Sequence, residues 1–330
     1  MDTMKTVLFY EFGGPEVLKI EDAPIPEPGP GEVLVKHEYI GVNFAETLLR
    51  RGLYTRSIQF KMPSGVGFEA SGYIVKLGEG AQGEGIREGA RVAALYRKSA
   101  AYAQYGVLTT KDVIPLPDEV PMEIGAAFPV QGLTAWHMLA ESHKTQPGES
   151  VLIHAVAGGC GLLCVQIAKH FGVRVIGTTS SEEKAKAARA MGADEIIIYT
   201  QGDWMREARK LSPGGVNLIL DSVGRDTFEK GLEALADFGQ IILYGSASGD
   251  VAQAVPQMLM RGSRSITGFW LNTVRDHPDI VRRDADAVLS LHREGKLKFT
   301  IDEVFPLTRA GDAQHKLESR QSIGKILIRC

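Results

Sequence analysis

The residue pattern with the clearest chemistry is a glycine-rich stretch, VLIHAVAGGCGLLCVQIAKHFG, at residues 151–172. An apolar strand is expected to end at the glycines, and an apolar helix is expected to follow them. In the pattern G-x-G-x-x-G, Val156 takes the first glycine position, while Gly158 and Gly161 take the other two. Such glycines let the backbone approach a pyrophosphate, which the N–H groups of the helix N-terminus bind. The stretch predicts a dinucleotide-binding turn formed by Ala157, Gly158, Gly159, Cys160 and Gly161.

A second polar cluster, TTSSEEK at residues 178–184, follows the next expected strand and bears on the choice of cofactor. An NAD site has an acidic residue at this strand end, where it binds the ribose 2′-hydroxyl. Here the position holds Thr179, and Ser180 and Lys184 follow it. Hydroxyls and a cation suit a 2′-phosphate, so the sequence favours NADP(H). Glu182 and Glu183 argue for the opposite choice, because carboxylates repel phosphate.

These residues need a parallel sheet to position them, and the chain after about residue 123 has that pattern. Short apolar strands alternate with helices, which is typical of a doubly wound α/β sheet of six strands that binds ligands at the carboxyl ends of its strands. The expected strands are 151–155, 173–178, 195–199, 216–221, 240–245 and 265–271. The expected helices lie near 132–141, 160–170, 182–191, 203–211, 226–236 and 254–261.

Before about residue 120 the pattern is instead that of a β-rich barrel or sandwich. Alternating runs are separated by Pro and Gly, as in PIPEPGPGE at residues 24–32. The expected strands are 6–10, 32–39, 72–77, 91–95 and 103–108, and one helix is expected at 43–51 with Asn43 as its cap. After residue 272 a helix at 279–294 and a strand at 325–329 complete the chain.

Composition excludes several other classes of protein. The chain has 330 residues and a net charge of −3, which argues against a protein built to bind nucleic acid. Three cysteines rule out a disulfide framework and a four-cysteine zinc site, and they suit a reducing, cytoplasmic setting. The first residues, MDTMKTVLFYEFGG, lack the apolar core of a signal peptide. The apolar run 151–168 contains three glycines and His154, so we expect no membrane span.

Several motifs together resemble one enzyme family. AVAGGCG with GTTSSEEK, DSVGRDT at 221–227 and GVNFAETLLRRGLY at 41–54 resemble the zeta-crystallin-like quinone oxidoreductases of the medium-chain dehydrogenase/reductase superfamily. The resemblance runs from GGPEVL at 13–18 to ESRQSIGKILI at 318–328.

This resemblance implies a domain organisation. A GroES-like catalytic domain would consist of residues 1–122 together with the returning segment 268–330. A Rossmann domain would occupy residues 123–267, and the cofactor would lie in the cleft between the two domains. The resemblance also implies a homodimer in which the last Rossmann strand, near 265–271, extends a sheet across the interface.

The resemblance also predicts a metal-free enzyme. Zinc-dependent relatives place a Cys and the His of a GHE motif on the catalytic metal. Here the Cys position holds Asn43, and the GHE motif reads Gly67-Phe68-Glu69. Neither Asn nor Phe is a usual zinc ligand. Without a Lewis acid, we expect an acceptor that takes hydride readily, namely a quinone or a conjugated carbonyl compound.

The resemblance also carries over site residues one by one. Asn43 would donate from its amide to an acceptor oxygen, or would serve only as a helix cap. Tyr54 would hydrogen-bond the substrate or pass it a proton, or would merely line the site. Further residues are expected to bind NADPH, although each could instead serve only in a turn or in core packing. These are Thr134, Thr179, Ser180, Lys184, Tyr199, Ser222, Tyr244, Gly245, Ser246, Phe269, Trp270, Leu271, Arg320 and Lys325, of which the last two are expected to contact phosphates.

The sequence therefore predicts NADPH-dependent reduction of quinones, with the acceptor held over the nicotinamide and without metal or flavin. A flavin is not expected because only one dinucleotide turn is visible. One alternative is a reductase of enones, alkenals or enoyl thioesters, in which a proton donor matters more. Replacing Tyr54 by Phe would separate the two, since only the alternative needs that donor. A second alternative is a non-catalytic NADPH-binding protein, because crystallin and RNA-binding roles occur among such relatives.

Overall fold

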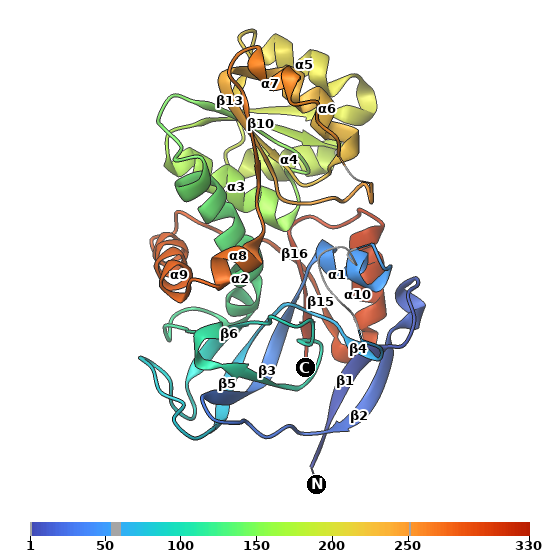
Figure 1. The fold of residues 1–330 in the computed structure, drawn as a ribbon, viewed down its shortest axis with the longest axis vertical. Coiled ribbons are helices and arrows are strands. Elements are labelled where there is room, and N and C mark those ends of the chain that lie inside the picture. The colour runs from blue at the N-terminus through green and yellow to red at the C-terminus, as the bar shows by residue number, and fades with distance from the viewer. Residues whose placement is uncertain (1, 54–60, 251) are drawn as a thin grey trace. The chain divides into compact units, whose positions relative to one another are not determined.

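The computed structural model, drawn in Figure 1, describes residues 2–53, 61–250 and 252–330. The chain divides into two compact units. Unit 1 comprises residues 1–130, 272–287 and 301–330, and unit 2 comprises residues 131–271 and 288–300. The predicted domain boundary at residue 123 falls at the beginning of helix α2 (Met122–Trp136), and the change of unit falls within that helix.

Unit 2 contains the predicted six-stranded parallel sheet, so the expected fold class is confirmed. The strands are β9 (Ser150–Ile153), β10 (Arg174–Thr179), β11 (Glu195–Ile198), β12 (Val216–Asp221), β13 (Leu235–Leu243) and β14 (Ser265–Gly268). Their order is β11-β10-β9-β12-β13-β14, so the winding direction reverses between β9 and β12. Sheets of this kind bind ligands at the carboxyl ends of the two strands between which the direction reverses.

Helices connect the strands of unit 2. They are α3 (Gly159–His170), α4 (Glu182–Ala190), α5 (Trp204–Leu211), α6 (Arg225–Ala234) and the short α7 (Gln257–Met260), while α2 continues into a π-helical turn (His137–Ser142). One row of the sheet, with Leu152, Ile176, Ile219 and Ile241 in register, packs against α5 and α6. This apolar layer holds the strand ends in place.

Unit 1 is rich in antiparallel strands, as the alternating runs predict. Its larger sheet has the order β15-β16-β3-β5-β6-β8, with β7 also pairing with β3, and a smaller sheet has the order β2-β1-β4. The strands are β1 (Thr3–Phe9), β2 (Lys19–Pro24), β3 (Glu32–Val42), β4 (Ser64–Gly65), β5 (Glu69–Leu77), β6 (Arg91–Leu95), β7 (Tyr105–Thr109), β8 (Val113–Pro115), β15 (Ile301–Pro306) and β16 (Lys325–Arg329). Its helices include α1 (Phe44–Arg50), α8 (Leu271–Arg275), α9 (Pro278–Arg293) and α10 (Ala310–Glu318), of which α8 and α9 also contribute residues to unit 2.

The end of the chain returns to the larger sheet, where β16 lies between β15 and β3. Strand β16 pairs antiparallel with β3, where Ile326 lies opposite Val42. On its other side β3 pairs with β5, where Gly41 lies opposite Glu69. Three segments that are far apart in the sequence therefore meet at the end of β3, next to the N-terminus of α1. Among the described helices, none is long and apolar enough to cross a bilayer.

Candidate active site

The glycine turn of unit 2 connects a strand to a helix, as the sequence predicts. The reason why a glycine is needed differs from the expected one at Gly159. Gly158 is the N-cap residue of α3, and a Cβ built on it would meet only the Ala155 carbonyl oxygen, at 3.3 Å. A Cβ at Gly161 would lie 2.6 Å from two backbone carbonyl oxygens, so this glycine serves close packing. A Cβ at Gly159 would lie 2.0 Å from Gln131 Oε1. Gly159 therefore makes room for a side chain of the protein itself, whereas a Cβ at Gly158 would be crowded by one backbone oxygen only.

Two strand ends beside this turn are fixed by hydrogen bonds. The Asp221 carboxylate at the end of β12 accepts from the backbone N–H groups of Val223 (2.8 Å) and Gly224 (3.0 Å). These bonds hold the turn that contains Ser222. A Cβ at Gly245 would lie 2.6 Å from the Ser222 carbonyl oxygen, so only glycine allows the two strand ends to approach this closely. Ser246 donates to the Asp250 carbonyl oxygen at 3.0 Å.

The end of β10 carries the residues that the sequence connects with a 2′-phosphate. The Thr200 hydroxyl donates to the Ser180 carbonyl oxygen at 2.9 Å, which fixes the turn after the strand. Glu182, which argued against a phosphate, forms an ion pair with Arg189 at 2.6 Å. Because its charge is compensated on its own helix, this carboxylate repels a phosphate less than the sequence alone suggests.

The remaining candidates in unit 2 include two partly exposed aromatic side chains. Tyr199 is 40% exposed and Trp270 is 43% exposed. Phe269 packs against His137 with 5.6 Å between ring centroids, which ties the segment after β14 to the π-helical turn. His137 thus has a packing role. Thr134 is buried on α2, and Leu271 begins α8.

Unit 1 contributes a buried cluster of charged and polar side chains at the end of β3. The Lys325 ammonium donates to Asn43 Oδ1 at 2.8 Å and to Glu69 Oε1 at 2.5 Å. Asn43 Nδ2 donates to the same Glu69 oxygen at 2.8 Å. Glu69 is fully buried, and Lys325 and Asn43 are 2% and 5% exposed. We call these three residues, together with Glu46 and Tyr102, the Asn43 cluster.

Glu46 completes the Asn43 cluster from the first turn of α1. Its carboxylate accepts from the Tyr102 hydroxyl at 2.7 Å, from the Asn43 backbone N–H at 3.1 Å and from the Phe68 backbone N–H at 3.1 Å. Asn43 Nδ2 also lies 3.3 Å from Glu46 Oε1. Burial raises the pKa of Glu46 to about 7, although the hydrogen bonds from Tyr102 and Asn43 oppose that shift.

Local features of the backbone make room for this cluster. A Cβ at Gly41 would lie 2.5 Å from Glu69 Oε1 and 2.3 Å from the Ala126 carbonyl oxygen, so glycine is required there. Pro129 lies inside α2, where a proline interrupts helical hydrogen bonding. The backbone N–H of the next residue, Val130, donates to Glu69 Oε2 at 2.7 Å. The Glu69 carboxylate is thereby fixed from three sides.

This geometry changes the expected roles of two residues. Asn43 is indeed the N-cap residue of α1, but its amide nitrogen points to the carboxylates of Glu69 and Glu46. An exchanged amide, with nitrogen facing the ammonium, would lose these bonds, so the orientation is unambiguous. Lys325, for which a phosphate contact was expected, is buried and bonded to Asn43 and Glu69 instead. Its placement favours a role inside unit 1.

Two further candidates cannot be placed in this cluster. Tyr54 lies outside the described residues, so its expected role stays a prediction. Arg320 lies two residues after the end of α10 and has a left-handed backbone conformation with φ of 58°.

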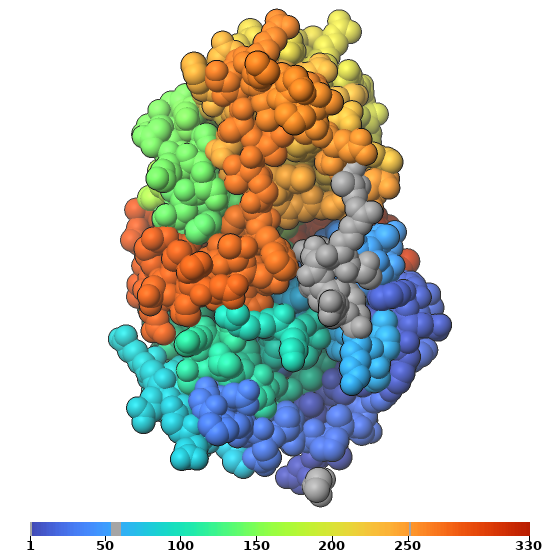
Figure 2. All heavy atoms as spheres, in the orientation of Figure 1, coloured from blue at the N-terminus to red at the C-terminus, as the bar shows by residue number. Residues whose placement is uncertain are grey.

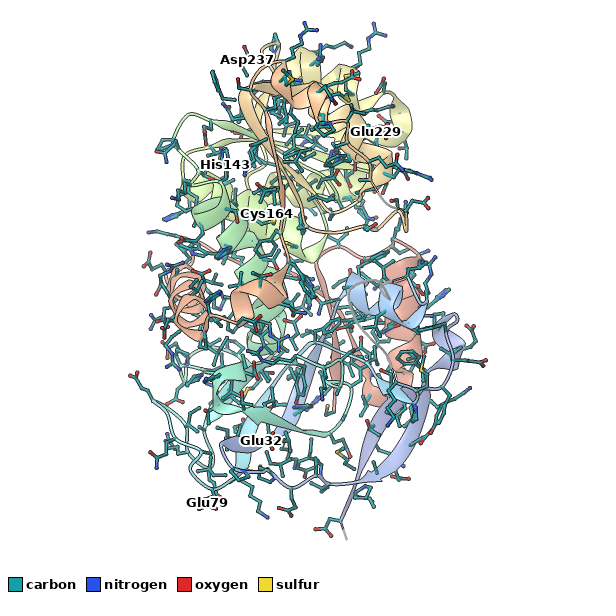
Figure 3. All side chains as sticks on the ribbon, in the orientation of Figure 1. Glu32, Glu79, His143, Cys164, Glu229 and Asp237 are labelled. Carbon is teal, nitrogen blue, oxygen red and sulfur yellow. The ribbon has the colours of Figure 1, made fainter. Side chains whose placement is uncertain are left out.

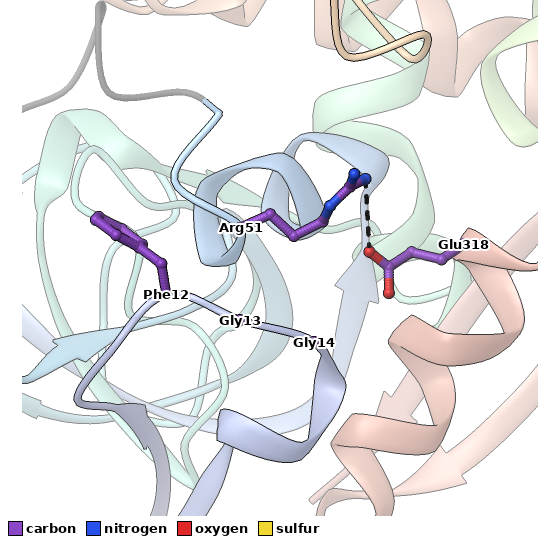
Figure 4. A pocket seen from close by; sticks show the side chains of 5 residues that line it. All are labelled: Phe12, Gly13, Gly14, Arg51 and Glu318. Atoms are coloured by element: carbon purple, nitrogen blue, oxygen red, sulfur yellow. Dashed lines mark ion pairs between the residues drawn. The ribbon is translucent and has the colours of Figure 1, made fainter.

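A separate pocket of about 330 Å³ lies at the other end of α1 (Figure 4). It is lined by Phe12, Gly13, Gly14, Arg51 and Glu318, and the Arg51 guanidinium lies 4.0 Å from the Glu318 carboxylate. The buried Arg50 donates to this same carboxylate at 2.6 Å and to Gln314 Oε1 at 2.7 Å. These bonds anchor the C-terminal end of α1, while the Asn43 cluster holds its N-terminal end.

The described side chains also bear on whether the protein could bind a metal ion. In the part of the chain that the structure describes, no group of three or more His, Cys, Asp or Glu side chains could hold a metal ion. Asn43 Oδ1 faces an ammonium, which would repel a metal cation at that oxygen. The metal-free enzyme stays a prediction that metal analysis can test.

Comparison with known proteins agrees with this two-part organisation. Residues 29–118 match the family of alcohol dehydrogenase GroES-like domains, and residues 159–286 match the zinc-binding dehydrogenase family. Both regions are those of the medium-chain dehydrogenase/reductase fold, which the resemblance predicted.

Several full-length relatives narrow the assignment. A quinone oxidoreductase of Pseudomonas aeruginosa is 36% identical over 98% of this chain and 99% of its own length. A 2-haloacrylate reductase of a Burkholderia species is 33% identical over 97% of both chains. The Escherichia coli quinone oxidoreductase, solved in complex with NADPH, is 31% identical with a TM-score of 0.93, covering 99% of this chain and 100% of its own. The chain therefore belongs to the quinone oxidoreductase family, and it is an oxidoreductase.

Sequence reasoning missed most of the Asn43 cluster. It singled out Asn43, but it gave no role to Glu46, Glu69 or Tyr102. One signal was present, because Glu46 follows Asn43 by three residues, which is the spacing of a capping box. The partnership with Lys325 had no local signal, since 282 positions separate it from Asn43.

Proposed function

We propose that this protein catalyses the reduction of quinones by NADPH. The observation that carries the proposal is the open glycine turn at the N-terminus of α3, which has no Cβ at Gly158 and lies beside a strand end with hydroxyl residues. Relatives solved with NADPH support the choice of cofactor. The name of the Pseudomonas aeruginosa relative supports a quinone as the acceptor.

The residues of unit 2 fit such a cofactor. The backbone N–H groups at the beginning of α3 would hold the pyrophosphate, because the twelve-residue helix has its positive end there. Thr179, Ser180 and Lys184 would hold the 2′-phosphate. When bound, NADPH supplies the hydride. A quinone that gains this hydride and one proton becomes a hydroquinone, so the overall reaction consumes one proton.

Unit 1 would supply the electrostatic environment for the acceptor. As the hydride arrives, negative charge develops on the acceptor oxygen, and nearby positive charge or N–H donors stabilise it. The Asn43 cluster contains both, namely the Lys325 ammonium and the Asn43 amide. We infer that Asn43 orients the acceptor and that Tyr54 assists it, as the family resemblance implies.

A second candidate function is reduction of a conjugated double bond. The specific observation that favours it is the 2-haloacrylate reductase, 33% identical over nearly the whole chain. Such a substrate needs a proton at carbon after hydride transfer, so a proton donor would be more important than in quinone reduction.

One experiment separates these functions. Purified protein is mixed with NADPH or NADH and with 1,4-benzoquinone, 9,10-phenanthrenequinone, an alkenal or 2-chloroacrylate, and oxidation of the nicotinamide is followed. We expect NADPH-selective turnover with the quinones. Turnover with the alkenal or 2-chloroacrylate alone would replace the first proposal by the second. Binding of NADPH without turnover on any acceptor would point to a non-catalytic protein.

We also infer that two copies pair through β14. This strand is at the edge of the six-stranded sheet, and an edge strand offers unpaired backbone groups to another chain. Apolar side chains are exposed nearby, including Met260 at 78% and Phe238 at 81%, and the surface of this segment faces the viewer in Figure 2. Light scattering during size-exclusion chromatography should give twice the mass of one chain, and a monomer mass would contradict the inference.

A further inference from the structure

The charges of the Asn43 cluster do not balance. Two carboxylates, Glu46 and Glu69, are fully buried, and among the described residues the ammonium beside them is that of Lys325. Lys325 bonds directly to Glu69, so Glu46 carries the charge that is least compensated. A buried charge without a partner is unfavourable, and a carboxylate in this situation tends to bind a proton.

The hydrogen bonds of Glu46 act in the opposite direction. All four groups around its oxygens are donors, namely the Tyr102 hydroxyl, two backbone N–H groups and the Asn43 amide. Donors favour the ionised carboxylate. Burial is the larger effect, and it raises the pKa of Glu46 to about 7. Glu46 therefore exchanges a proton near neutral pH while it remains in contact with Asn43.

We propose that Glu46 is a positioning residue for the reaction, which binds or releases a proton and thereby controls how the Asn43 amide is presented to the acceptor. This inference rests on the proposed function, because it assigns a role at the site proposed for the acceptor. The side chains that act on Glu46 come from other segments or from the helix start: Tyr102, Lys325 of β16 and Asn43, whose amide Glu46 shares with Glu69 of β5.

The two protonation states of Glu46 differ in charge and in hydrogen bonding. When Glu46 is ionised, the Asn43 cluster carries one net negative charge and the carboxylate attracts the Asn43 amide hydrogen. When Glu46 is protonated, the cluster is neutral and this attraction is weaker, so the amide hydrogen can donate to an acceptor oxygen. The bound proton can point to the Tyr102 oxygen, since a hydroxyl accepts as well as donates. The reaction does not consume this proton, which exchanges with solvent.

A pH profile of turnover tests this role. NADPH-dependent quinone reduction is measured from acidic to alkaline pH for the wild-type protein, for Glu46→Gln and for Glu32→Gln. Glu32 (labelled in Figure 3) is a matched control, because it lies at the opposite end of β3 and caps the Gly29 backbone N–H. We expect the wild-type kcat to fall about tenfold as pH rises through the Glu46 midpoint, since negative charge next to the developing oxyanion raises the barrier.

The variants should distinguish a positioning role of Glu46 from a purely structural one. Glu46→Gln should show no fall near neutral pH and should bind NADPH as the wild type does, and Glu32→Gln should keep the wild-type profile. Tyr102→Phe removes one donor to the carboxylate, so the midpoint of the pH profile should move to higher pH. A merely structural role would instead lower kcat equally at every pH. An unchanged profile in Glu46→Gln would overturn the inference.

An independent readout distinguishes failure of the inference from failure of the proposed function. Infrared difference spectra recorded across neutral pH should show the carbonyl band of a protonated carboxylic acid, and Glu46→Gln should lack it. Absence of this band in the wild type overturns the inference whatever the enzyme reduces. Presence of the band without turnover on any acceptor overturns the proposed function, and with it the role given to Glu46.

Discussion

The candidate residues of unit 2 and those of unit 1 differ in chemical character. In unit 2 the glycine turn and the strand ends present backbone groups and hydroxyls, and the turn is open at Gly158. In unit 1 the Asn43 cluster is made of buried, charged side chains that bond to one another. The unit 2 residues are backbone groups and hydroxyls of turns, while the unit 1 residues are closely tied to the stability of their own unit.

This contrast predicts which changes affect folding and which affect binding. Removing one partner of a buried ion pair leaves the other charged and unpaired, so it destabilises the fold. Adding a Cβ to a turn with free space leaves the fold intact but obstructs a ligand. Stability and cofactor affinity should therefore respond to different variants.

The largest effect is expected for Lys325→Met. This variant leaves the fully buried Glu69 without its ammonium partner, so we expect a loss of about 3–5 kcal/mol in the free energy of unfolding. Denaturant titration measures the loss. The double variant Lys325→Met with Glu69→Gln removes both charges and should recover a large part of it. A single variant as stable as the wild type would contradict the importance of the pair.

A somewhat smaller effect concerns the pH dependence of stability. The pKa of Glu46 is about 7 in the folded protein, whereas the ordinary value of 4.5 applies to the unfolded chain. Between pH 4.5 and about 7 the folded chain therefore holds a proton that the unfolded chain has lost. Stability should therefore fall as pH rises through this range, by about 3 kcal/mol, and level off above it.

A comparison of the wild type with Glu46→Gln separates the contribution of Glu46 to the pH dependence of stability from that of other titrating groups. Buried His37 and His154 have a pKa lowered to about 4 by burial, so their contribution rises with pH and opposes that of Glu46. The difference between wild type and variant removes the histidine contributions. A difference that is constant from acidic to alkaline pH would show that Glu46 does not titrate in this range.

Gly158→Val tests the proposed cofactor-binding role of the glycine turn in unit 2. The backbone of Gly158 is extended, and a Cβ there would be tight only against the Ala155 carbonyl oxygen, at 3.3 Å, so the melting temperature should fall only slightly. The dissociation constant for NADPH should rise about 100-fold, because the lost phosphate hydrogen bonds correspond to about 2.7 kcal/mol. Gly214→Ala is the control, since a Cβ there meets no atom within 4 Å. Unchanged affinity in Gly158→Val would contradict the assignment of the turn.

The smallest effect is expected for Lys184→Ala. If Lys184 binds the 2′-phosphate, the variant should weaken NADPH about tenfold, which is about 1.4 kcal/mol, and should leave NADH almost unaffected. Lys186→Ala, two residues further along α4 and exposed, serves as the control. Titration of both cofactors against both variants measures the difference. Equal weakening of NADPH and NADH in Lys184→Ala would remove the phosphate role.

Much of unit 2 could be predicted because its strands carry strong local signals. The expected strand 216–221 matches β12, and the expected helix 160–170 differs from α3 by one residue at its beginning. In unit 1, β2 and α10 were missed. Strand β2 has no buried residue among KIEDAP, and α10 buries only three of its nine, so neither has a strong hydrophobic pattern.

The sequence by itself determined the strand, glycine turn and helix at residues 150–170, the parallel sheet and the family, because these depend on residues that are neighbours in the chain. The tertiary structure alone decided the surroundings of Asn43. Lys325, Glu69 and Asn43 meet only because β16 and β5 pair with β3 on either side, and no local pattern specifies that register. The same pairing buries Glu46 away from water, so its proton affinity is a property of the folded chain.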